Sequence, residues 1–216
     1  MGADQAATAA TSPVAVHPNL APEDRARGEF YAVLARLFAS APDAELLRLI
    51  AVAPELPSEE CDSELPRAWN RLRDASSVME AEAADDEYTT LFIGVGRSEV
   101  DLHASHWIGA AKAEKPLVAV RADLARLGLA RLTDVNIYED HLSVLLETMR
   151  VLILGAPGRV PGTIAEQQAF FAAHITPWVD ECCDAINAKP VASYYRCVAQ
   201  LLKSMLTIER DAFAIQ

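Results

Sequence analysis

Residues 138–154 read YEDHLSVLLETMRVLIL and predict the helix around which the chain folds. With successive residues about 100° apart, one side of this helix is fully apolar. That side consists of Leu142, Leu145, Leu146, Met149, Leu152 and Ile153. On the opposite side Asp140 and Glu147 lie about 20° apart, two turns from each other, and Val144 and Val151 share their side. A helix with apolar residues on two sides is usually central in a bundle.

The remaining sequence is also dominated by helical periodicity, and alternation typical of strands is scarce. The expected helices span residues 23–40, a stretch that starts near 43, then 64–83, 84–93, 116–128, 138–154, 162–175, 177–187 and 191–210. Phe171, His174 and Trp178 follow the spacing of one helix face. Pro177 is unfavourable inside a helix, so either a kinked helix or a new helix is expected there. The pattern predicts an all-α fold.

The length of 216 residues fits a single domain. Residues 1–22 are rich in Ala, Thr and Pro and nearly uncharged, which predicts a disordered tail before a helical domain at 23–216. The start lacks the basic and apolar regions of a secretory signal, and no apolar run approaches the roughly 20 residues that span a bilayer. We therefore expect a cytoplasmic protein that does not insert into membranes.

The chain is acidic, with 19 Lys and Arg against 31 Asp and Glu and a formal net charge of −12. Because nucleic-acid phosphates are repelled by such a surface, nucleic acid is not an expected partner. A partner that carries arginines suits the charge, which also serves simply to keep a protein soluble.

Catalytic and metal-binding patterns are weak. His103 and His106 could ligate a metal with Glu99 or Asp101, which keeps a small helical metal-binding protein as the least favoured alternative. The four cysteines form no C-x-x-C pair. Neighbouring helical residues do not face each other, so Asp140 followed by His141 is no acid–base dyad. We expect no enzyme activity, no catalytic residue, no bound cofactor and no metal.

The mixed face of 138–154 is the candidate binding site. Carboxylates at Asp140 and Glu147 suit the fork of an arginine side chain, while Val144 and Val151 suit an apolar stretch. Internal roles are the competing interpretation, because Asp140 could cap a helix and Glu147 could pair with an arginine of this chain.

Three blocks of the chain resemble one known family, the TorD/DmsD/NarJ type of redox-enzyme maturation chaperone. The first is EYTTLFIG at 87–94, which continues into Ala104-Ser105-His106-Trp107. The second is Asp140-His141-Leu142 with Glu147 and Met149. The third is Phe171-x-x-His174-x-x-x-Trp178. The resemblance covers roughly residues 24–210, and the three blocks together are more specific than any one of them.

The resemblance implies an all-α, single-domain bundle of about ten helices. It implies a cytoplasmic chaperone that binds the twin-arginine signal peptide and the apo form of a molybdenum-cofactor oxidoreductase, assists insertion of the cofactor and delays export. It places the peptide site at Asp140, His141 and Glu147, with Ser105 and Trp107 nearby. Members of the family form monomers or domain-swapped dimers, and the sequence does not choose between them.

A second branch of the same family offers an alternative function. Chaperones of the NarJ branch assemble a molybdoenzyme subunit that is not exported. Such a chaperone would recognise an N-terminal segment mainly by apolar contact, with little need for arginines.

Overall fold

The structure of the protein is a computed structural model, which describes residues 20–57, 64–94, 96–109, 115–130 and 137–215. Most of the tail predicted at 1–22 lies outside these residues. The elements are α1 Pro22–Ala39, α2 Ala44–Ala51, α3 Glu64–Val78, α4 Ala81–Tyr88, the π-helical turn η1 Thr89–Ile93, α5 Ala104–Trp107, α6 Pro116–Arg126, α7 Leu142–Leu154, α8 Ile164–His174, α9 Val179–Asn187 and α10 Tyr194–Ile215. The described residues form no strand, so the all-α prediction is confirmed.

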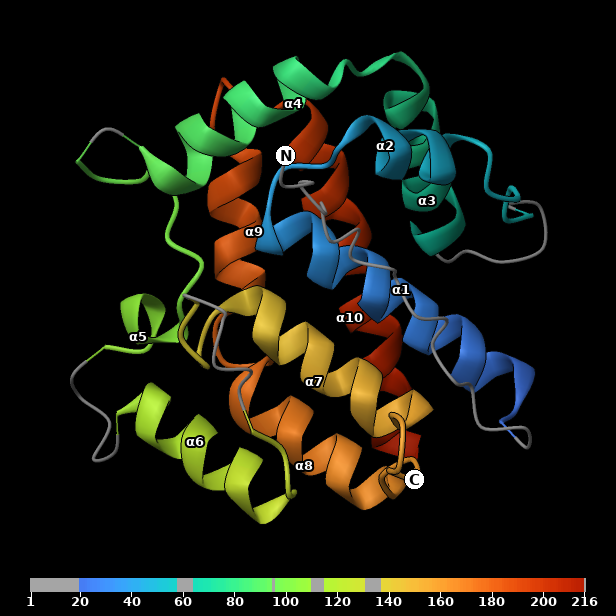
Figure 1. Ribbon diagram of the computed structural model, residues 1–216, viewed down its shortest axis with the longest axis vertical. Coiled ribbons are helices and arrows are strands. Elements are labelled where there is room, and N and C mark those ends of the chain that lie inside the picture. The colour runs from blue at the N-terminus through green and yellow to red at the C-terminus, as the bar shows by residue number, and fades with distance from the viewer. Residues whose placement is uncertain (1–19, 58–63, 95, 110–114, 131–136, 216) are drawn as a thin grey trace, which may run out of the picture.

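Helix α7 lies at the centre of the bundle, as its sequence predicted. It packs along α1, with α8 on another side (Figure 1). Its predicted apolar face is at most 1% exposed at every position. The approach of α1 is close because residue 28 is a glycine: a Cβ atom there would lie 2.3 Å from Cγ of Leu154. Any larger residue at position 28 therefore forces the Leu154 side chain or the packing of α1 on α7 to shift.

The start of α7 differs from the prediction. The helix begins at Leu142 and not at Tyr138, because His141 serves as its N-cap and accepts a hydrogen bond from the backbone N–H of Ser143 at 3.2 Å. Residues 138–141 instead run beside residues 102–104. The backbone N–H of Ala104 donates to the carbonyl of Asp140 at 2.9 Å. Asp140 therefore precedes the helix and does not share a helical face with Glu147.

Helix α10 extends behind α1 and α7 and contacts α1, α3, α4 and α9 (Figure 1). Its start is held by Glu87 of α4, whose carboxylate accepts hydrogen bonds from the backbone N–H groups of Ser193, Tyr194 and Tyr195 at 2.8–3.1 Å. A carboxylate stabilises a helix N-terminus because it satisfies free N–H groups and opposes the helix dipole. The first of the three sequence blocks thus has a structural role at Glu87.

At Pro177 the chain starts a new helix rather than kinking an old one, since α8 ends at His174 and α9 begins at Val179. The N-cap residue of α9 is Trp178. Cys182 and Cys183 of α9 are buried free thiols. Within the described ranges, no helix is long and apolar enough to cross a bilayer.

Candidate ligand-binding groove

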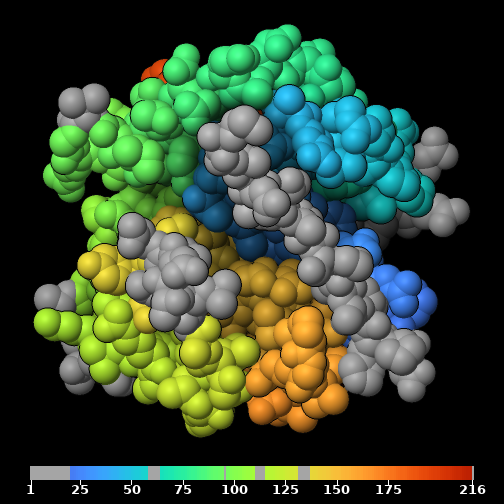
Figure 2. Space-filling model, in the orientation of Figure 1, coloured from blue at the N-terminus to red at the C-terminus, as the bar shows by residue number. Residues whose placement is uncertain are grey.

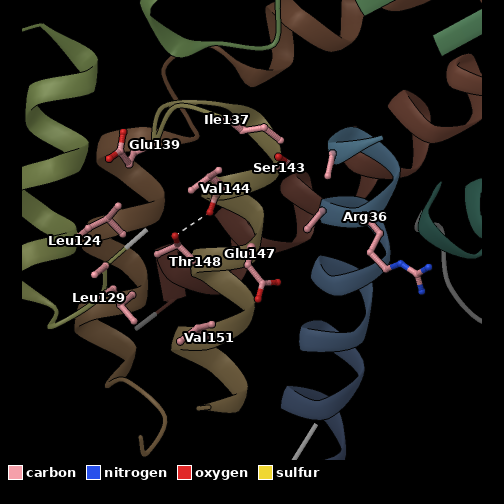
Figure 3. Close-up of a pocket in the computed structure, with 13 residues that line it drawn as sticks. Arg36, Leu124, Leu129, Ile137, Glu139, Ser143, Val144, Glu147, Thr148 and Val151 are labelled. Atoms are coloured by element: carbon pink, nitrogen blue, oxygen red, sulfur yellow. Dashed lines mark hydrogen bonds between the residues drawn. The ribbon is translucent and has the colours of Figure 1, made fainter. Parts of the chain in front are cut away.

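A cavity of about 400 Å³ opens between α1, α6 and α7. Figure 3 shows α7 in the middle, with α6 on one side and α1 on the other. We call this cavity the groove. Its lining residues are Ala35, Arg36, Ala39, Leu124, Leu129, Ala130, Ile137, Glu139, Ser143, Val144, Glu147, Thr148 and Val151. In the space-filling view, atoms of α1 and α7 meet near the centre of one face, with α6 and α8 beneath them (Figure 2).

Three of the predicted binding residues lie in this groove. Val144, Glu147 and Val151 line it together, because positions i, i+3 and i+7 fall on one face of a helix. The other two lining residues from α7 are Ser143 and Thr148. The hydroxyl of Thr148 donates to the carbonyl of Val144 at 2.8 Å, so it presents its methyl group rather than a free donor to a ligand. The floor of the groove is therefore mainly apolar.

Two carboxylates border this floor, one on each side of α7. Glu147 projects on the side of α1, and Glu139 lies on the side of α6 (Figure 3). Both oxygens of Glu147 accept hydrogen bonds from Arg150, at 2.7 Å from Nε and 2.6 Å from Nη2. Glu139 pairs with Arg121 at 2.9 Å. Each hydrogen-bonded carboxylate raises the pKa of its arginine.

The other predicted residues gather in a second region, which we call the loop junction: residues 101–107 and 138–142. Asp140 is 2% exposed, and one of its oxygens accepts hydrogen bonds from the backbone N–H of Ser105 at 3.0 Å and from its hydroxyl at 2.5 Å. The backbone N–H of Leu142 donates to the carbonyl of Leu102 at 2.8 Å. Asp140 thus joins α5 to the turn before α7, which is the capping role that competed with peptide binding.

His141 is buried in the same junction and lies against the ring of His103, with 4.8 Å between the ring centroids. Burial, and next the electrostatic interaction with His103, lower the pKa of His141 to about 4. The side chain of His103 bonds Asp101 at 2.9 Å. Burial opposes ionisation of Asp101, but hydrogen bonds from His103 outweigh it and lower the pKa of this carboxyl group. His141 therefore acts as a neutral cap near pH 7.

Trp107, which was also predicted to contact a ligand, is half-buried at the back of the junction. Its indole N–H donates to the carbonyl of Asp101 at 2.8 Å, and its ring stacks on Trp178 with centroids 6.5 Å apart. Trp178 in turn donates to the carbonyl of His174 at 2.7 Å. His174 bonds Asp123 of α6 at 2.7 Å. The third sequence block therefore connects the junction with the helix that forms one wall of the groove.

The lining from α1 and α6 could not be identified from the sequence. Ala35 and Ala39 are spaced one turn apart and leave room beside α7, but alanines at this spacing are common on packed helices. Leu124 and Leu129 read as ordinary core residues. Glu139 stands directly before Asp140 and carried no distinguishing signal. Only the contact between distant segments shows that these residues share a cavity.

The metal alternative finds no support in the part of the chain that the structure describes. His103 and His106 both approach Asp101, at 2.9 and 4.0 Å. No group of three or more His, Cys, Asp or Glu side chains within the described ranges has an arrangement that could hold a metal ion.

Comparison with known proteins identifies the family. Residues 58–184, more than half of the chain, match the family described as the nitrate reductase delta subunit. A solved structure from Archaeoglobus fulgidus, described as a candidate redox enzyme maturation protein, aligns with a TM-score of 0.51 and 20% sequence identity over 82% of this chain and 93% of the other. At this identity the likeness shows the fold alone. No curated protein sequence is significantly similar. The chain therefore belongs to the nitrate reductase delta subunit family, the NarJ/TorD type of redox-enzyme maturation chaperone.

Proposed function

We propose that this protein is a cytoplasmic chaperone, without enzyme activity, that binds the twin-arginine signal peptide and the apo form of a molybdenum-cofactor oxidoreductase. Bound in this way, the client would receive its cofactor before export. The observation that carries the proposal is the groove, because it combines an apolar floor at Val144 and Val151 with carboxylates at Glu139 and Glu147. A twin-arginine signal peptide has the matching chemistry, since it places two arginines before an apolar stretch.

The groove is the proposed primary contact, and the loop junction the proposed secondary one. Ser105 is exposed and Trp107 is half-buried at the junction, so both are accessible to a longer peptide. Asp140 and His141 are at most 7% exposed. We infer that these two contribute by fixing the start of α7, and through it the position of Val144 and Glu147, rather than by direct contact.

The test is calorimetric titration of the protein with a synthetic signal peptide from a molybdoenzyme encoded beside its gene. A control peptide carries lysines in place of both arginines. Micromolar or tighter binding that is lost with lysine is expected, because lysine cannot form two parallel hydrogen bonds to a carboxylate. Absence of binding to either peptide, both by the wild type and by variants in which Glu139 and Glu147 have lost their own arginine partners, would contradict the proposal.

A second function, assembly of a molybdoenzyme subunit that is not exported, is favoured by one observation. Both carboxylates of the groove already pair with arginines of this chain, and the floor between them is apolar. An apolar N-terminal segment could occupy this floor without disturbing either pair. Binding that survives replacement of both client arginines by alanine would select this function. Sedimentation of the complex would also distinguish a monomer from a domain-swapped dimer.

A further inference from the structure

We propose that Arg121 and Arg150 are internal substitutes for the arginine pair of the client, so that the client binds by exchanging its arginines for these two. The inference rests on the proposed function and concerns the same groove. It assigns specificity to two residues that lie outside all three sequence blocks of the family resemblance.

Arg150 and Glu147 of α7 form a two-bond ion pair. Arg150 approaches Glu147 through Nε and Nη2, and each nitrogen reaches a different carboxylate oxygen, at 2.7 and 2.6 Å. This fork is the arrangement in which arginine binds a carboxylate most strongly. A client arginine at Glu147 would use the same atoms in the same geometry. Arg150 and a client arginine therefore compete for one acceptor.

The other carboxylate of the groove also pairs with an arginine of this chain, through an ion-pair contact. Glu139 is 13% exposed and pairs with Arg121, whose side chain is 50% exposed. Both acidic residues that line the cavity thus carry an arginine from this chain. Neither Arg121 nor Arg150 lines the cavity, so each could withdraw from its carboxylate without vacating the floor.

The two carboxylates of the groove are placed to receive two separate arginines. They lie on opposite sides of α7, Glu139 towards α6 and Glu147 towards α1 (Figure 3). In an extended peptide, consecutive side chains point in opposite directions. Two adjacent arginines in a segment that runs along the floor would therefore point to opposite walls. The arrangement fits a pair of neighbouring arginines better than a single one.

Displacement of Arg150 from Glu147 would improve the hydrogen bonding of its guanidinium group. Its side chain is only 14% exposed, and within the described residues its Nη1 atom is buried without a hydrogen-bond partner. A buried donor without a partner is costly. Release from Glu147 would allow this nitrogen to reach water, which offsets part of the lost ion pair. The free-energy cost of displacing Arg150 is therefore smaller than the loss of its two hydrogen bonds to Glu147 alone.

The experiment is titration of the wild-type protein and of R121A, R150A and the double variant with the twin-arginine peptide and its twin-lysine control. Removing each competitor should strengthen arginine-peptide binding about two- to fivefold, which is the scale of one exposed ion pair. The ratio of the affinity for the twin-arginine peptide to that for the twin-lysine peptide should rise as well. Only arginine can form two parallel hydrogen bonds to a carboxylate that has lost its internal partner. In an E147Q background, R150A should give no gain.

R67A provides the matched control. Arg67 pairs with Glu64 three residues away, as Arg150 does with Glu147. The side chain of Arg67 is 51% exposed, both residues lie on α3, and neither lines the groove. R67A changes the net charge by the same amount and should leave affinity unchanged. An equal gain in R67A would mean a general charge effect and would overturn the exchange.

The outcomes separate this inference from the proposed function. If the wild type binds with arginine preference but R121A and R150A bind equally well or more weakly, the exchange is wrong and the proposed function stands. If the wild type binds neither peptide and the variants bind the arginine peptide, the exchange is supported in the form of a self-blocked groove. If no variant binds either peptide, both proposals fail.

Discussion

The loop junction and the groove share the stretch 138–154, yet their polar groups are used in opposite ways. In the junction, Asp140 and His141 are buried, and they accept hydrogen bonds from the backbone N–H groups of Ser105 in α5 and Ser143 in α7. In the groove, Glu147 is 49% exposed, and its partner among the described residues is Arg150 on the same helix. Buried polar groups such as those of the junction fix a conformation, because removing one leaves its hydrogen-bond partner unsatisfied. Exposed polar groups such as Glu147 in the groove remain free to change partner.

The largest effect should come from Asp140→Ala, which breaks the junction. The backbone N–H and the hydroxyl of Ser105, which is itself exposed, would lose the buried carboxylate of Asp140 that accepts both hydrogen bonds. We expect unfolding in urea to become easier by about 2–3 kcal/mol. Asp140→Asn keeps one acceptor oxygen and should lose less. An Asp140→Ala variant that is as stable as the wild type but binds peptide poorly would make Asp140 a contact residue and remove the distinction between the two regions.

Lowering the pH should also reduce the stability of the folded protein, because His141 of the junction is buried in its neutral form. Its pKa of about 4 in the folded protein lies below the ordinary value of about 6.5. Between these values the unfolded chain takes up a proton that the folded chain does not, so stability falls as the pH falls from about 6.5 to 4. The full shift corresponds to about 3 kcal/mol.

His141→Asn retains a capping acceptor and removes the titration. The measurement is the free energy of unfolding of both proteins at several pH values. The variant should show a flatter profile between pH 6.5 and 4. The lowered pKa of Asp101 adds a separate loss of stability at lower pH, as its carboxylate is protonated. Parallel profiles of wild type and variant would show that His141 ionises normally in the folded protein.

Substitution in the groove should affect binding and spare stability. Val151→Asp places a charge on the apolar floor, and we expect the signal peptide to bind about tenfold more weakly. The unfolding midpoint should change little, because Val151 is only partly buried. Val118→Asp is the matched control, since Val118 is 51% exposed on α6 and does not line the groove. Equal losses in both variants would mean that added negative charge, and not the floor, weakens binding.

The comparison also explains what could be predicted from the sequence. The apolar face of residues 142–153 correctly predicted that this helix is central in the bundle. Apolar residues at helical spacing indicate which side of a helix is buried, even when the helices that cover it are not known. The start of α7 was predicted four residues too early, since the bonds that end the turn at His141 come from residues 102–104. A contact between segments that lie far apart in the sequence leaves no periodic signal.

The same reasoning applies to the candidate site. Val144, Glu147 and Val151 were brought together correctly because helical spacing alone joins them. Asp140 was placed on the same face only by extending the helix too far. Glu139, Ala35 and Leu124 were missed because their proximity depends on how α1 and α6 pack on α7. Lining residues that share one helix could thus be predicted from the sequence, whereas lining residues that come together only through packing between helices could not.

The smallest effect should come from Glu147→Gln, and it addresses whether the exposed acid recognises arginine at all. The substitution keeps the size and one acceptor oxygen but removes the charge, so a client arginine loses its ionic partner and not its space. Calorimetry should show about threefold weaker binding of the twin-arginine peptide, the scale of one exposed ion pair, with a smaller change for the twin-lysine peptide. Glu64→Gln on α3 removes an equivalent exposed acid away from the groove and should change neither affinity. If Glu147→Gln binds both peptides as the wild type does, the groove recognises its client by apolar contact, which favours the non-exported client because the arginine pair would then have no acceptor at Glu147.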